Sequence, residues 1–513
     1  MKAPGGISCY LRDNAPYSRA GSPGSPLLLS RRFQTLIELH RPFIPENSRL
    51  KYISTRGGAE SQSLAQLLTR GTASDGGLFV PSTWPAVDST TLETLLDGEY
   101  ADIATRILHL FGGDTLPDGL IKNALQTAMA KFDDPVGPPI NALGDGLWTM
   151  ELMHGPTLAF KDFALAPLGE IIDHTLQHHD QRATVLCATS GDTGAATVSA
   201  FANRARLNAV VLYPDGGVSE FQRRQMTTTG AANVLPLCIN GDFDECQKIV
   251  KSLYQTEAAK IHGYTAVNSI NIVRILLQSA YYLRTSGIIS RKTGKACNFV
   301  VPTGNFGNIY AAYIAKQLGA PVGKLIVTSN DNDVLPRLFD TSTMSGNQTV
   351  KTISPSMDIQ VSSNFERLLW HVKNKDGAAV RALQDSLEAD NQYQLSDAEM
   401  SQLQTDFTAF KCTESEALTA IKKTWDNHKK IICPHSATAF HAATKAANAL
   451  DGDTVIVETA HPAKFADAVY QAIGVHPELP ASAVAMLVAK EIFTSADASA
   501  HSVQAAIDKQ FSH

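Results

Sequence analysis

The chain has 513 residues, 44% of them hydrophobic, so it can bury a large core and is expected to form two or more domains. Its net charge of −6 gives no general attraction to nucleic acid or to an anionic membrane, and no apolar run reaches the roughly 18 residues of a spanning helix. Seven cysteines, scattered without CxxC pairs, favour free thiols in a reducing compartment over a zinc site or a disulfide framework. We therefore expect a cytoplasmic protein that binds neither nucleic acid nor membrane.

Residues 1–50 differ in composition from the rest of the chain. They hold seven basic and three acidic residues, for a net charge of +4, with many Ser, Pro and Gly and little periodicity. This composition predicts disorder. An organelle transit peptide fits partly, because such peptides are rich in Arg and Ser and poor in acids. A mis-called start codon at or near Leu50 fits as well.

Residues 51–145 are predicted to form a small, mostly helical N-terminal domain. Apolar residues recur at helical spacing in segments 91–96 and 103–111, and residues 75–81 are typical of a turn that leads into a short strand. This region contains no evident catalytic constellation.

A single lysine, Lys161, lies in an otherwise apolar stretch. Residues 147–153 suit a strand, a Gly-Pro turn follows, and apolar residues then recur at helical spacing, so Lys161 falls at or just inside a helix N-terminus. The helix dipole and burial beside Phe160 and Phe163 both favour the neutral amine, which is the form that a Schiff base needs. The commoner alternative is a surface lysine on an amphipathic helix.

Between residues 146 and 330, strands alternate with helices, which predicts a parallel sheet. Ligands of such sheets gather beyond the carboxyl ends of the strands. The turn after the strand predicted at 183–188 offers hydroxyls and helix N-terminal amides to an anion. An ordinary capped helix start explains it equally well. The residues in question are Ser190, Gly191, Asp192 and Thr193.

A second unit of this kind follows the strand predicted at 298–302. Its two glycines allow the backbone to approach a phosphate closely, and the helix that follows supplies amide donors. The turn is neither a P-loop nor GxGxxG, which weakens an ATP or dinucleotide assignment. Its residues are Gly304, Asn305, Phe306, Gly307 and Asn308.

Residues 331–430 are predicted to be a mostly helical, largely solvated insertion that covers the α/β core. Residues 431–513 return to that core, with strands predicted at 430–433 and 454–458 and a helical tail at 495–513. No HExxH or paired ligand spacing appears, so no metal is predicted.

Motifs in family order connect these segments: YISTRG, HGPTLAFKDFA, ATSGDTGAA, LYPDGGVSEFQ, NSINIVRIL, VPTGNFGN, SPSMDIQVSSNFERLLW and ETAHPAKFADAV. From about Lys51 onward the chain resembles the threonine synthase family, in particular its longer bacterial and fungal class. The resemblance implies a fold type II pyridoxal-phosphate (PLP) enzyme, similar to the tryptophan synthase β subunit, with parallel sheets flanked by helices and a helical insertion. The chain departs from the family at Cys433-Pro434-His435-Ser436, where the first and last residues are usually Asp and Thr. Asn308 is a second departure, because an acid is frequent there.

The resemblance also implies roles for individual residues. Lys161 would carry PLP and then move protons, and Thr459 would place its hydroxyl against the pyridine nitrogen. The residues expected to wrap the cofactor phosphate are Gly304, Asn305, Phe306, Gly307 and Asn308. Those expected to hold the anionic groups of the substrate are Ser190, Gly191, Asp192, Thr193, Asn271 and Arg274.

The implied reaction converts O-phospho-L-homoserine and water to L-threonine and phosphate by γ-elimination and β-addition, in a monomer or homodimer. Two alternatives remain at this point. A PLP-dependent phospholyase or dehydratase would release 2-oxobutyrate instead, and a non-catalytic anion or nucleotide binder would use the same Gly-containing turns.

Overall fold

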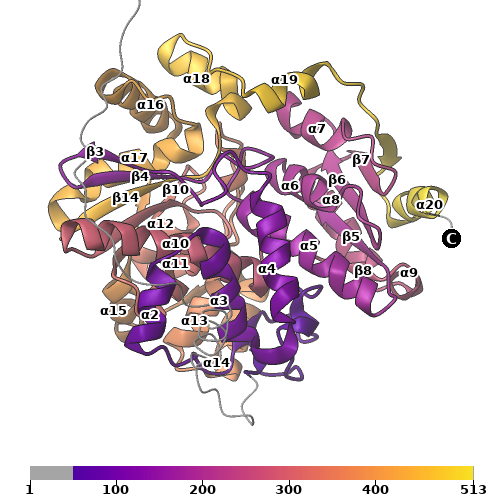
Figure 1. Cartoon of the computed structure of the whole chain (residues 1–513), viewed down its shortest axis with the longest axis horizontal. Coiled ribbons are helices and arrows are strands. Elements are labelled where there is room, and N and C mark those ends of the chain that lie inside the picture. Colours follow the sequence, from indigo (N-terminus) through magenta and orange to yellow (C-terminus); the bar gives the residue numbers. More distant parts are fainter. Residues whose placement is uncertain (1–49, 512–513) are drawn as a thin grey trace, which may run out of the picture. The chain divides into compact units, whose positions relative to one another are not determined.

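Two largely parallel β-sheets organise this computed structural model, which describes residues 50–511 apart from the side chains of Asp114, Asp118 and Ser482 (Figure 1). The larger sheet has the strand order β13-β10-β9-β14-β4-β3, with only β3 antiparallel to its neighbour. The smaller sheet has the order β15-β7-β6-β5-β8 and is parallel throughout. The expectations for the N-terminal 49 residues lie outside the described residues.

The strands of the larger sheet are β3 Ile140–Gly144, β4 Leu147–Glu151, β9 Cys297–Pro302, β10 Val322–Ser329, β13 Phe407–Lys411 and β14 Asp453–Glu458. Those of the smaller sheet are β5 Ala183–Ala188, β6 Leu207–Pro214, β7 Val234–Asn240, β8 Tyr264–Thr265 and β15 Thr494–Asp497. Two further antiparallel pairs join β1 Tyr52–Ser54 to β2 Phe79–Pro81, and β11 Thr343–Ser345 to β12 Gln392–Gln394.

The strands follow from continuous apolar runs. Every residue of β9 is buried, as parallel strands with helices on both faces require. The first helices after these strands are α5 Asp162–His178, α6 Asp192–Phe201, α7 Glu220–Thr227, α8 Phe243–Leu253, α9 Glu257–Ile261 and α11 Gly307–Gln317. On the larger sheet α17 Pro434–Ala446 contacts β9, β10 and β14, while α8 contacts β5 and β6 of the smaller one. The predicted helix-flanked parallel sheets are therefore present.

One long helix, α10 Ile272–Thr293, is central to the core. Sixteen of its 22 residues are buried, so it is an interior helix and not an amphipathic surface helix. It contacts α5 and α11 as well as two N-terminal helices, α2 Ser89–Leu96 and α3 Tyr100–Gly112. The Tyr100 hydroxyl donates to the carbonyls of Phe163 (2.5 Å) and Leu277 (3.2 Å). The N-terminal region, which also holds α4 Asp118–Met129, thus shares its hydrophobic core with the sheets.

The segment 331–430 does more than cover the core. Its strand β13 pairs in parallel with β10, with Leu325 opposite Phe407, and so forms one edge of the larger sheet. The expectation of a mostly helical, solvated insertion missed this strand and was wrong for α13 Phe365–Val372, which is buried at seven of its eight positions. The other helices are α12 Val334–Thr341, α14 Gly377–Asp390, α15 Asp397–Asp406 and α16 Glu414–His428.

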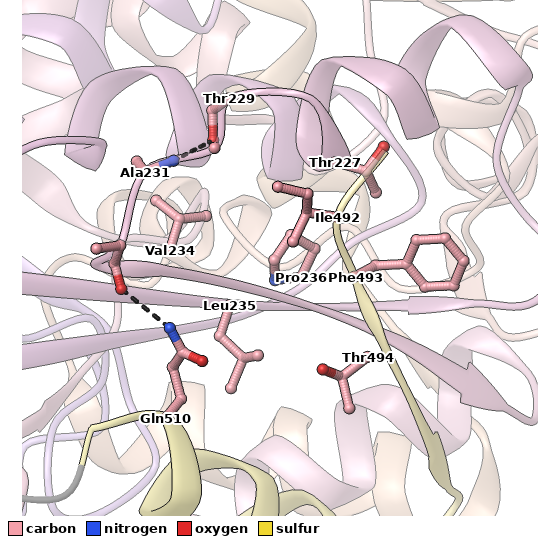
Figure 2. A pocket seen from close by; sticks show the side chains of 12 residues that line it. Thr227, Thr229, Ala231, Val234, Leu235, Pro236, Ile492, Phe493, Thr494 and Gln510 are labelled. Carbon is pink, nitrogen blue, oxygen red and sulfur yellow. Dashed lines mark hydrogen bonds between the residues drawn. The ribbon is translucent and has the colours of Figure 1, made fainter. Parts of the chain in front are cut away.

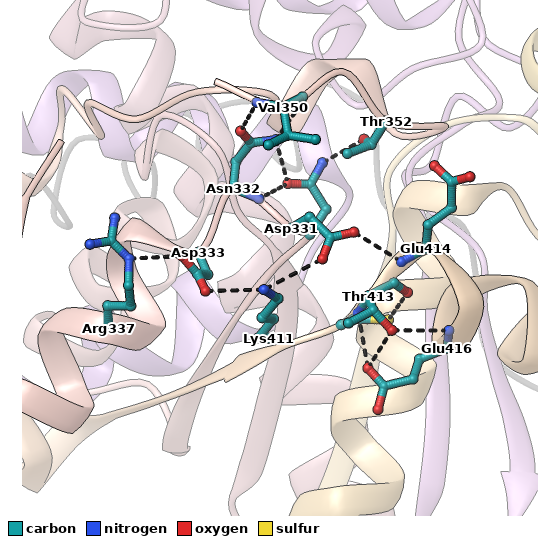
Figure 3. A network of polar contacts seen from close by, with 12 residues as sticks. Asp331, Asn332, Asp333, Arg337, Val350, Thr352, Lys411, Thr413, Glu414 and Glu416 are labelled. Atoms are coloured by element: carbon teal, nitrogen blue, oxygen red, sulfur yellow. Dashed lines mark hydrogen bonds and ion pairs between the residues drawn. The ribbon is translucent and has the colours of Figure 1, made fainter. Parts of the chain in front are cut away.

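A polar network ties the ends of β10 and β13 together (Figure 3). Lys411 lies between Asp331 (3.4 Å) and Asp333 (3.2 Å), and the amide of Glu414 donates to Asp331. At the start of α16, Thr413 and Glu416 form a capping box. Such reciprocal bonds satisfy the free amides of a helix start and fix the direction in which the helix leaves the sheet.

Two local expectations near the C-terminus differ from the structure. Residues 430–433 form no strand; they are an extended connection that ends at Cys433, whose side chain caps α17. The tail is not wholly helical, because β15 adds to the edge of the smaller sheet before α20 Ala500–Gln510 begins. Both segments are four residues long, which is too short for periodicity to distinguish a strand from a loop. The last two helices before this tail are α18 Ala466–Ile473 and α19 Ala481–Val488.

A cavity of about 210 Å³ lies where the chain after α7 and strand β7 meet the segment leading into β15 (Figure 2). Its walls combine hydroxyl groups, such as those of Thr227 and Thr494, with apolar side chains such as Leu235 and Ile492. None of the lining residues is charged, and none is a residue for which the sequence predicts a site role.

Within residues 50–511, no helix is both long and apolar enough to cross a membrane.

We expect Arg367→Met to lower the free energy of unfolding by about 2–4 kcal/mol, since it leaves buried acceptors without their donor. The guanidinium of Arg367 donates to the carbonyls of Phe79 (2.9 Å) and Ile270 (2.7 Å) and to the Asn364 side chain. Thermal and denaturant unfolding measure the change. The control, Arg381→Met, removes a half-exposed guanidinium that lies 3.5 Å from Asp75, and it should cost no more than about 1 kcal/mol. If the two substitutions lowered the free energy of unfolding equally, the buried hydrogen bonds of Arg367 would not have the stabilising role assigned to them.

Candidate active site

Lys161 lies at the carboxyl edge of the larger sheet, immediately before α5. Its position is fixed by a short antiparallel contact between residues 158–160 and 459–461, in which Phe160 N donates to Thr459 O (2.9 Å) and His461 N to Leu158 O (3.0 Å). Lys161 is 8% exposed, and its ammonium lies 4.7 Å from the centre of the Phe160 ring. The local pairing thus brings Lys161 and Thr459, which are far apart in sequence, into one site.

A buried carboxylate, Asp192, faces Lys161 from the start of α6, the helix that follows β5 of the smaller sheet. Lys161 Nζ lies 3.2 Å from Asp192 Oδ2, and Lys464 Nζ lies 2.8 Å from Asp192 Oδ1. Two neutral groups complete the shell: Gln222 Nε2 donates to Oδ1 (2.9 Å) and Ser356 Oγ to Oδ2 (3.3 Å). The carboxylate is therefore fully engaged by four side chains from four different parts of the chain.

The charges of this cluster shift one another. Burial lowers the pKa of Lys161 from its ordinary value; Asp192 opposes this effect, while Lys464 and Arg274 add to it. Burial alone would raise the pKa of Asp192, but Lys161 and Lys464 outweigh it and hold that pKa well below its usual range. Asp192 is thus an anion at neutral pH, and the amine of Lys161 loses its proton more readily than an exposed lysine.

The turn 304–308 lies at the carboxyl end of β9, next to β14. A Cβ atom on Gly304 would lie 2.8 Å from Ser356 O, so only glycine fits beneath the covering chain. Phe306 adopts a left-handed conformation (φ 62°) and packs edge-on against Phe365. A non-glycine residue held in this region is strained, and such strain is concentrated at functional turns. α11 begins at Gly307, so its first amides face this turn.

Asn308 adds a side-chain donor to the turn. Its Oδ1 accepts hydrogen bonds from Tyr281 (2.5 Å) and Tyr282 (2.9 Å), which fixes the orientation of the amide. Its buried Nδ2 has no hydrogen-bond partner among the described residues. A buried, unpaired donor is costly unless an acceptor occupies the site.

The segment 352–364 covers this turn. Ser362 Oγ donates to Gly304 O (2.7 Å), and Asn364 Nδ2 donates to Asn305 O (2.7 Å). Asp358 holds the segment at its other end, since it accepts from Asn330 Nδ2 (2.7 Å) and from the amide of Thr352 (2.9 Å). Ser356, which contacts Asp192, is therefore carried on a loop anchored at both ends.

The turn Cys433–Ser436 supports the other side of the site. Ser436 Oγ accepts from the amide of Thr459 (3.3 Å), and His435 Nε2 accepts from the amide of Ser356 (3.2 Å). Burial lowers the pKa of His435 to about 3, so the ring is neutral. Because Nε2 is an acceptor, Nδ1 carries the proton, and this buried donor has no partner in the described chain. Ser436 thus holds the backbone of Thr459, and Cys433 in turn contacts Ser436.

The predicted substrate residues are found in different settings. Ser190 and Thr193 are half-buried at the start of α6, and Gly191 (φ 133°) has no room for a side chain because a Cβ would lie 2.3 Å from Gln222. Asn271 caps α10, and its Nδ2 donates to the carbonyls of Leu67 and Leu68. That amide is already occupied by protein groups.

Arg274 is 2% exposed; its Nη1 donates to Val267 O (2.7 Å), and its Nε has no partner within residues 50–511. Burial lowers the pKa of Arg274 to about 10, so the group stays cationic at neutral pH. Arg274 is therefore suited to bind an anionic group of a ligand.

Sequence reasoning did not single out Lys464, Gln222, Ser356 or His435 as site residues. Three of them are in recognised motifs, but nothing in their local spacing indicates that they meet Asp192.

Three potential metal ligands lie together elsewhere: Cys412, Glu416 and His441. They surround the start of α16, where the helix dipole disfavours a cation, and Glu416 is engaged in the capping box. The six described cysteines are free, as the sequence predicts.

Comparison with known proteins identifies the family. Residues 138–460 match the family model of pyridoxal-phosphate dependent enzymes, residues 51–129 that of the threonine synthase N terminus, and residues 436–507 that of the threonine synthase C-terminal region. The threonine synthase of Pseudomonas aeruginosa is 37% identical over 439 residues, which cover 84% of this chain and 92% of that protein. The chain belongs to the threonine synthase family.

Solved structures of the threonine synthase family agree with this. The crystal structure of PLP-bound threonine synthase from Brucella melitensis has a TM-score of 0.85 and 37% identity, covering 90% of this chain and 99% of that one. The yeast threonine synthase has a TM-score of 0.85 and 34% identity, with coverage of 90% and 99%. The predicted fold type II architecture is confirmed, and the chain is a PLP-dependent enzyme.

The residues present fit this cofactor. A buried lysine with a lowered pKa offers an amine to the aldehyde group, and the glycine turn with the unpaired Asn308 Nδ2 at a helix start offers donors to the phosphate. Thr459 is 4% exposed and lies on the chain paired with Phe160.

Gly304→Ala is expected to raise the dissociation constant for PLP about tenfold or more, since the added methyl group must displace the Ser356 backbone. Titration of the protein with PLP, followed by absorbance or fluorescence, measures this change. Gly119→Ala in α4 is the control, because a Cβ there meets nothing within 4 Å. Unchanged PLP affinity in Gly304→Ala would show that the turn does not hold the cofactor.

Proposed function

We propose that this enzyme converts O-phospho-L-homoserine and water to L-threonine and phosphate, with Lys161 as the residue that carries PLP. The observation that supports this most directly is the meeting of Lys161, Thr459 and the glycine turn 304–308 at adjacent strand ends, although they are separated by up to about 300 residues. The proposed setting is the cytoplasm, which suits the buried free thiols, and the proposed assembly is a monomer or homodimer.

When bound, PLP supplies an aldehyde that condenses with amines and a ring that stabilises negative charge on neighbouring carbon atoms. The chain's own residues supply binding and proton transfer. Donors from Gly304, Gly307 and Asn308 would hold the cofactor phosphate, with the α11 dipole favouring its negative charge. Thr459 Oγ1 would meet the pyridine nitrogen. A hydroxyl there is neutral and does not keep the nitrogen protonated as a carboxylate would.

Lys161 is proposed to move protons between neighbouring carbon atoms of the substrate. Its pKa is lowered by burial, which brings it nearer to neutral pH, where a base and its conjugate acid are both available. Phe160 and the loop that carries Ser356 shield Nζ from solvent, which limits loss of the proton to water.

The substrate's negative groups require cations or amide donors. Arg274 is the proposed partner for one of them, since it is a buried cation with an unpaired Nε. Ser190, Gly191 and Thr193 are proposed to hold another with their hydroxyls and the first amides of α6. Asp192, an anion surrounded by two lysines, is proposed to orient Lys161 and not to receive an anion. Asn271 is proposed to act indirectly, by fixing the start of the helix that carries Arg274.

Replacement of Lys161 tests the proposal directly. Lys161→Ala should abolish the visible absorbance of the bound cofactor and lower threonine formation by about 1000-fold or more, because both the anchor and the proton carrier are lost. Lys316→Ala, which removes a lysine paired with Asp406 in another part of the fold, should leave both unchanged. Product analysis with O-phospho-L-homoserine should give threonine and phosphate in equal amounts; 2-oxobutyrate as the main product would contradict the proposal.

A second substitution tests the role of Thr459. Thr459→Val keeps the shape of the side chain but removes the hydroxyl, so kcat should fall about tenfold, the value of one lost hydrogen bond in the transition state. Thr459→Ser retains the hydroxyl and should keep most of the activity. Steady-state kinetics measure both. If the valine and serine variants have the same kcat, Thr459 does not act through its hydroxyl.

A further inference from the structure

Lys464 is the most completely buried charged group of the site. Its side chain has no exposed surface, and its ammonium donates to the Thr157 carbonyl (2.8 Å) while pairing with Asp192 Oδ1 (2.8 Å). Two lysines therefore share one carboxylate. Burying an ammonium is expensive unless it is paired, so a second lysine here needs a reason beyond packing.

The two lysines bind opposite oxygens of Asp192. Lys161 and Ser356 contact Oδ2, whereas Lys464 and Gln222 contact Oδ1. The contact with Lys464 is the shorter one, and Lys464 is held in place by Thr157, on the same turn that leads into Lys161. Lys161 can therefore leave Asp192 without leaving the carboxylate unpaired.

We propose that Lys464 is a positioning residue, the permanent counter-ion of Asp192, which allows the Lys161 nitrogen to release its proton and move during the reaction. The inference rests on the proposed role of Lys161 and deepens it. Without Lys464, the full charge of Asp192 would act on the Lys161 nitrogen and hold it as a cation. With Lys464, that charge is largely neutralised, and Lys161 can alternate between charged and neutral forms.

The surroundings agree with this division of roles. The charged or titratable groups that act on Lys161 are Asp192, Lys464 and Arg274, and Lys161 and Lys464 also act on the neutral His435. Asp192 is the carboxylate that pairs with Lys161. The other buried acid nearby on the chain, Asp162, is bound to the amide and hydroxyl of Thr157. When Lys161 moves, Lys464 is the lysine that stays paired with Asp192.

The test compares Lys464→Gln and Lys464→Arg in the holoenzyme. Glutamine keeps a hydrogen-bond donor but removes the charge, whereas arginine keeps the charge. The pH at which the visible cofactor band changes reports the protonation of the Lys161 nitrogen. We expect this midpoint to rise by about one pH unit or more in Lys464→Gln, a tenfold or greater gain in proton affinity, and to stay near its wild-type value in Lys464→Arg. Lys316→Gln is the matched control and should not move it.

A purely structural role for Lys464 predicts lower thermal stability in both variants with an unchanged midpoint, and that result would overturn the inference. If Lys464→Gln does not bind the cofactor, the double variant Asp192→Asn with Lys464→Gln is measured against Asp192→Asn. Because the charge of Lys464 also acts directly on the Lys161 nitrogen, the inference requires a higher midpoint in the double variant than in Asp192→Asn, and equal midpoints would contradict it. Failure of the proposed function is distinguishable, since it would appear as a cofactor band that survives Lys161→Ala.

Discussion

The site depends on one buried anion. Asp192 begins the helix that follows β5 in the smaller sheet, and it receives Lys161 and Lys464 from loops that follow β4 and β14 in the larger sheet. A carboxylate that is 4% exposed must be paired, and the groups that pair with it come from both sheets. The ion cluster thus connects the two sheets, and its charges also set the direction of the pKa shift of Lys161, the proposed carrier of PLP.

The remaining architecture keeps that cluster dry and rigid. The covering segment 352–364 is attached to the glycine turn by Ser362 and Asn364, and Arg367 one turn later binds the backbone of both the β2 strand and the loop before α10. Further along the chain, β13 pairs with β10 at the edge of the larger sheet. This pairing gives the segment 331–430 a second attachment to the core. The segment 331–430 thus contributes contacts to both the glycine turn and Asp192.

Much of the site could be predicted from local sequence, for a physical reason. The turns at Gly304 and Thr459 follow the neighbouring strands β9 and β14, and a parallel sheet necessarily brings such turns to one edge. The turn at Ser190 follows β5 in the same way, but in the smaller sheet. Lys161 was recognisable because an apolar surrounding is unusual for a lysine. By contrast, Lys464 and Gln222 meet Asp192 only through the relative placement of the two sheets, which no local pattern encodes. Strand β13 was missed for a similar reason, because a five-residue edge strand between two helices gives little periodicity.

The charged side chains at the carboxyl edge of the larger sheet form two separate clusters, because neighbouring residues at a strand end point to opposite faces. Glu458 directly precedes Thr459, yet it belongs to a different cluster: it lies 3.0 Å from Lys430 and opposite Glu151 in the sheet register. Burial raises the pKa of Glu458 to about 7. Because successive side chains at a strand end point to opposite faces, a carboxylate at 458 can stabilise the sheet while position 459 presents a neutral hydroxyl to the site. The site itself keeps an excess of positive charge from Lys161, Lys464 and Arg274 over Asp192. That excess is the electrostatic complement of the phosphate of PLP and of the proposed phosphorylated substrate, so the same imbalance that would destabilise an empty core would favour binding of these ligands.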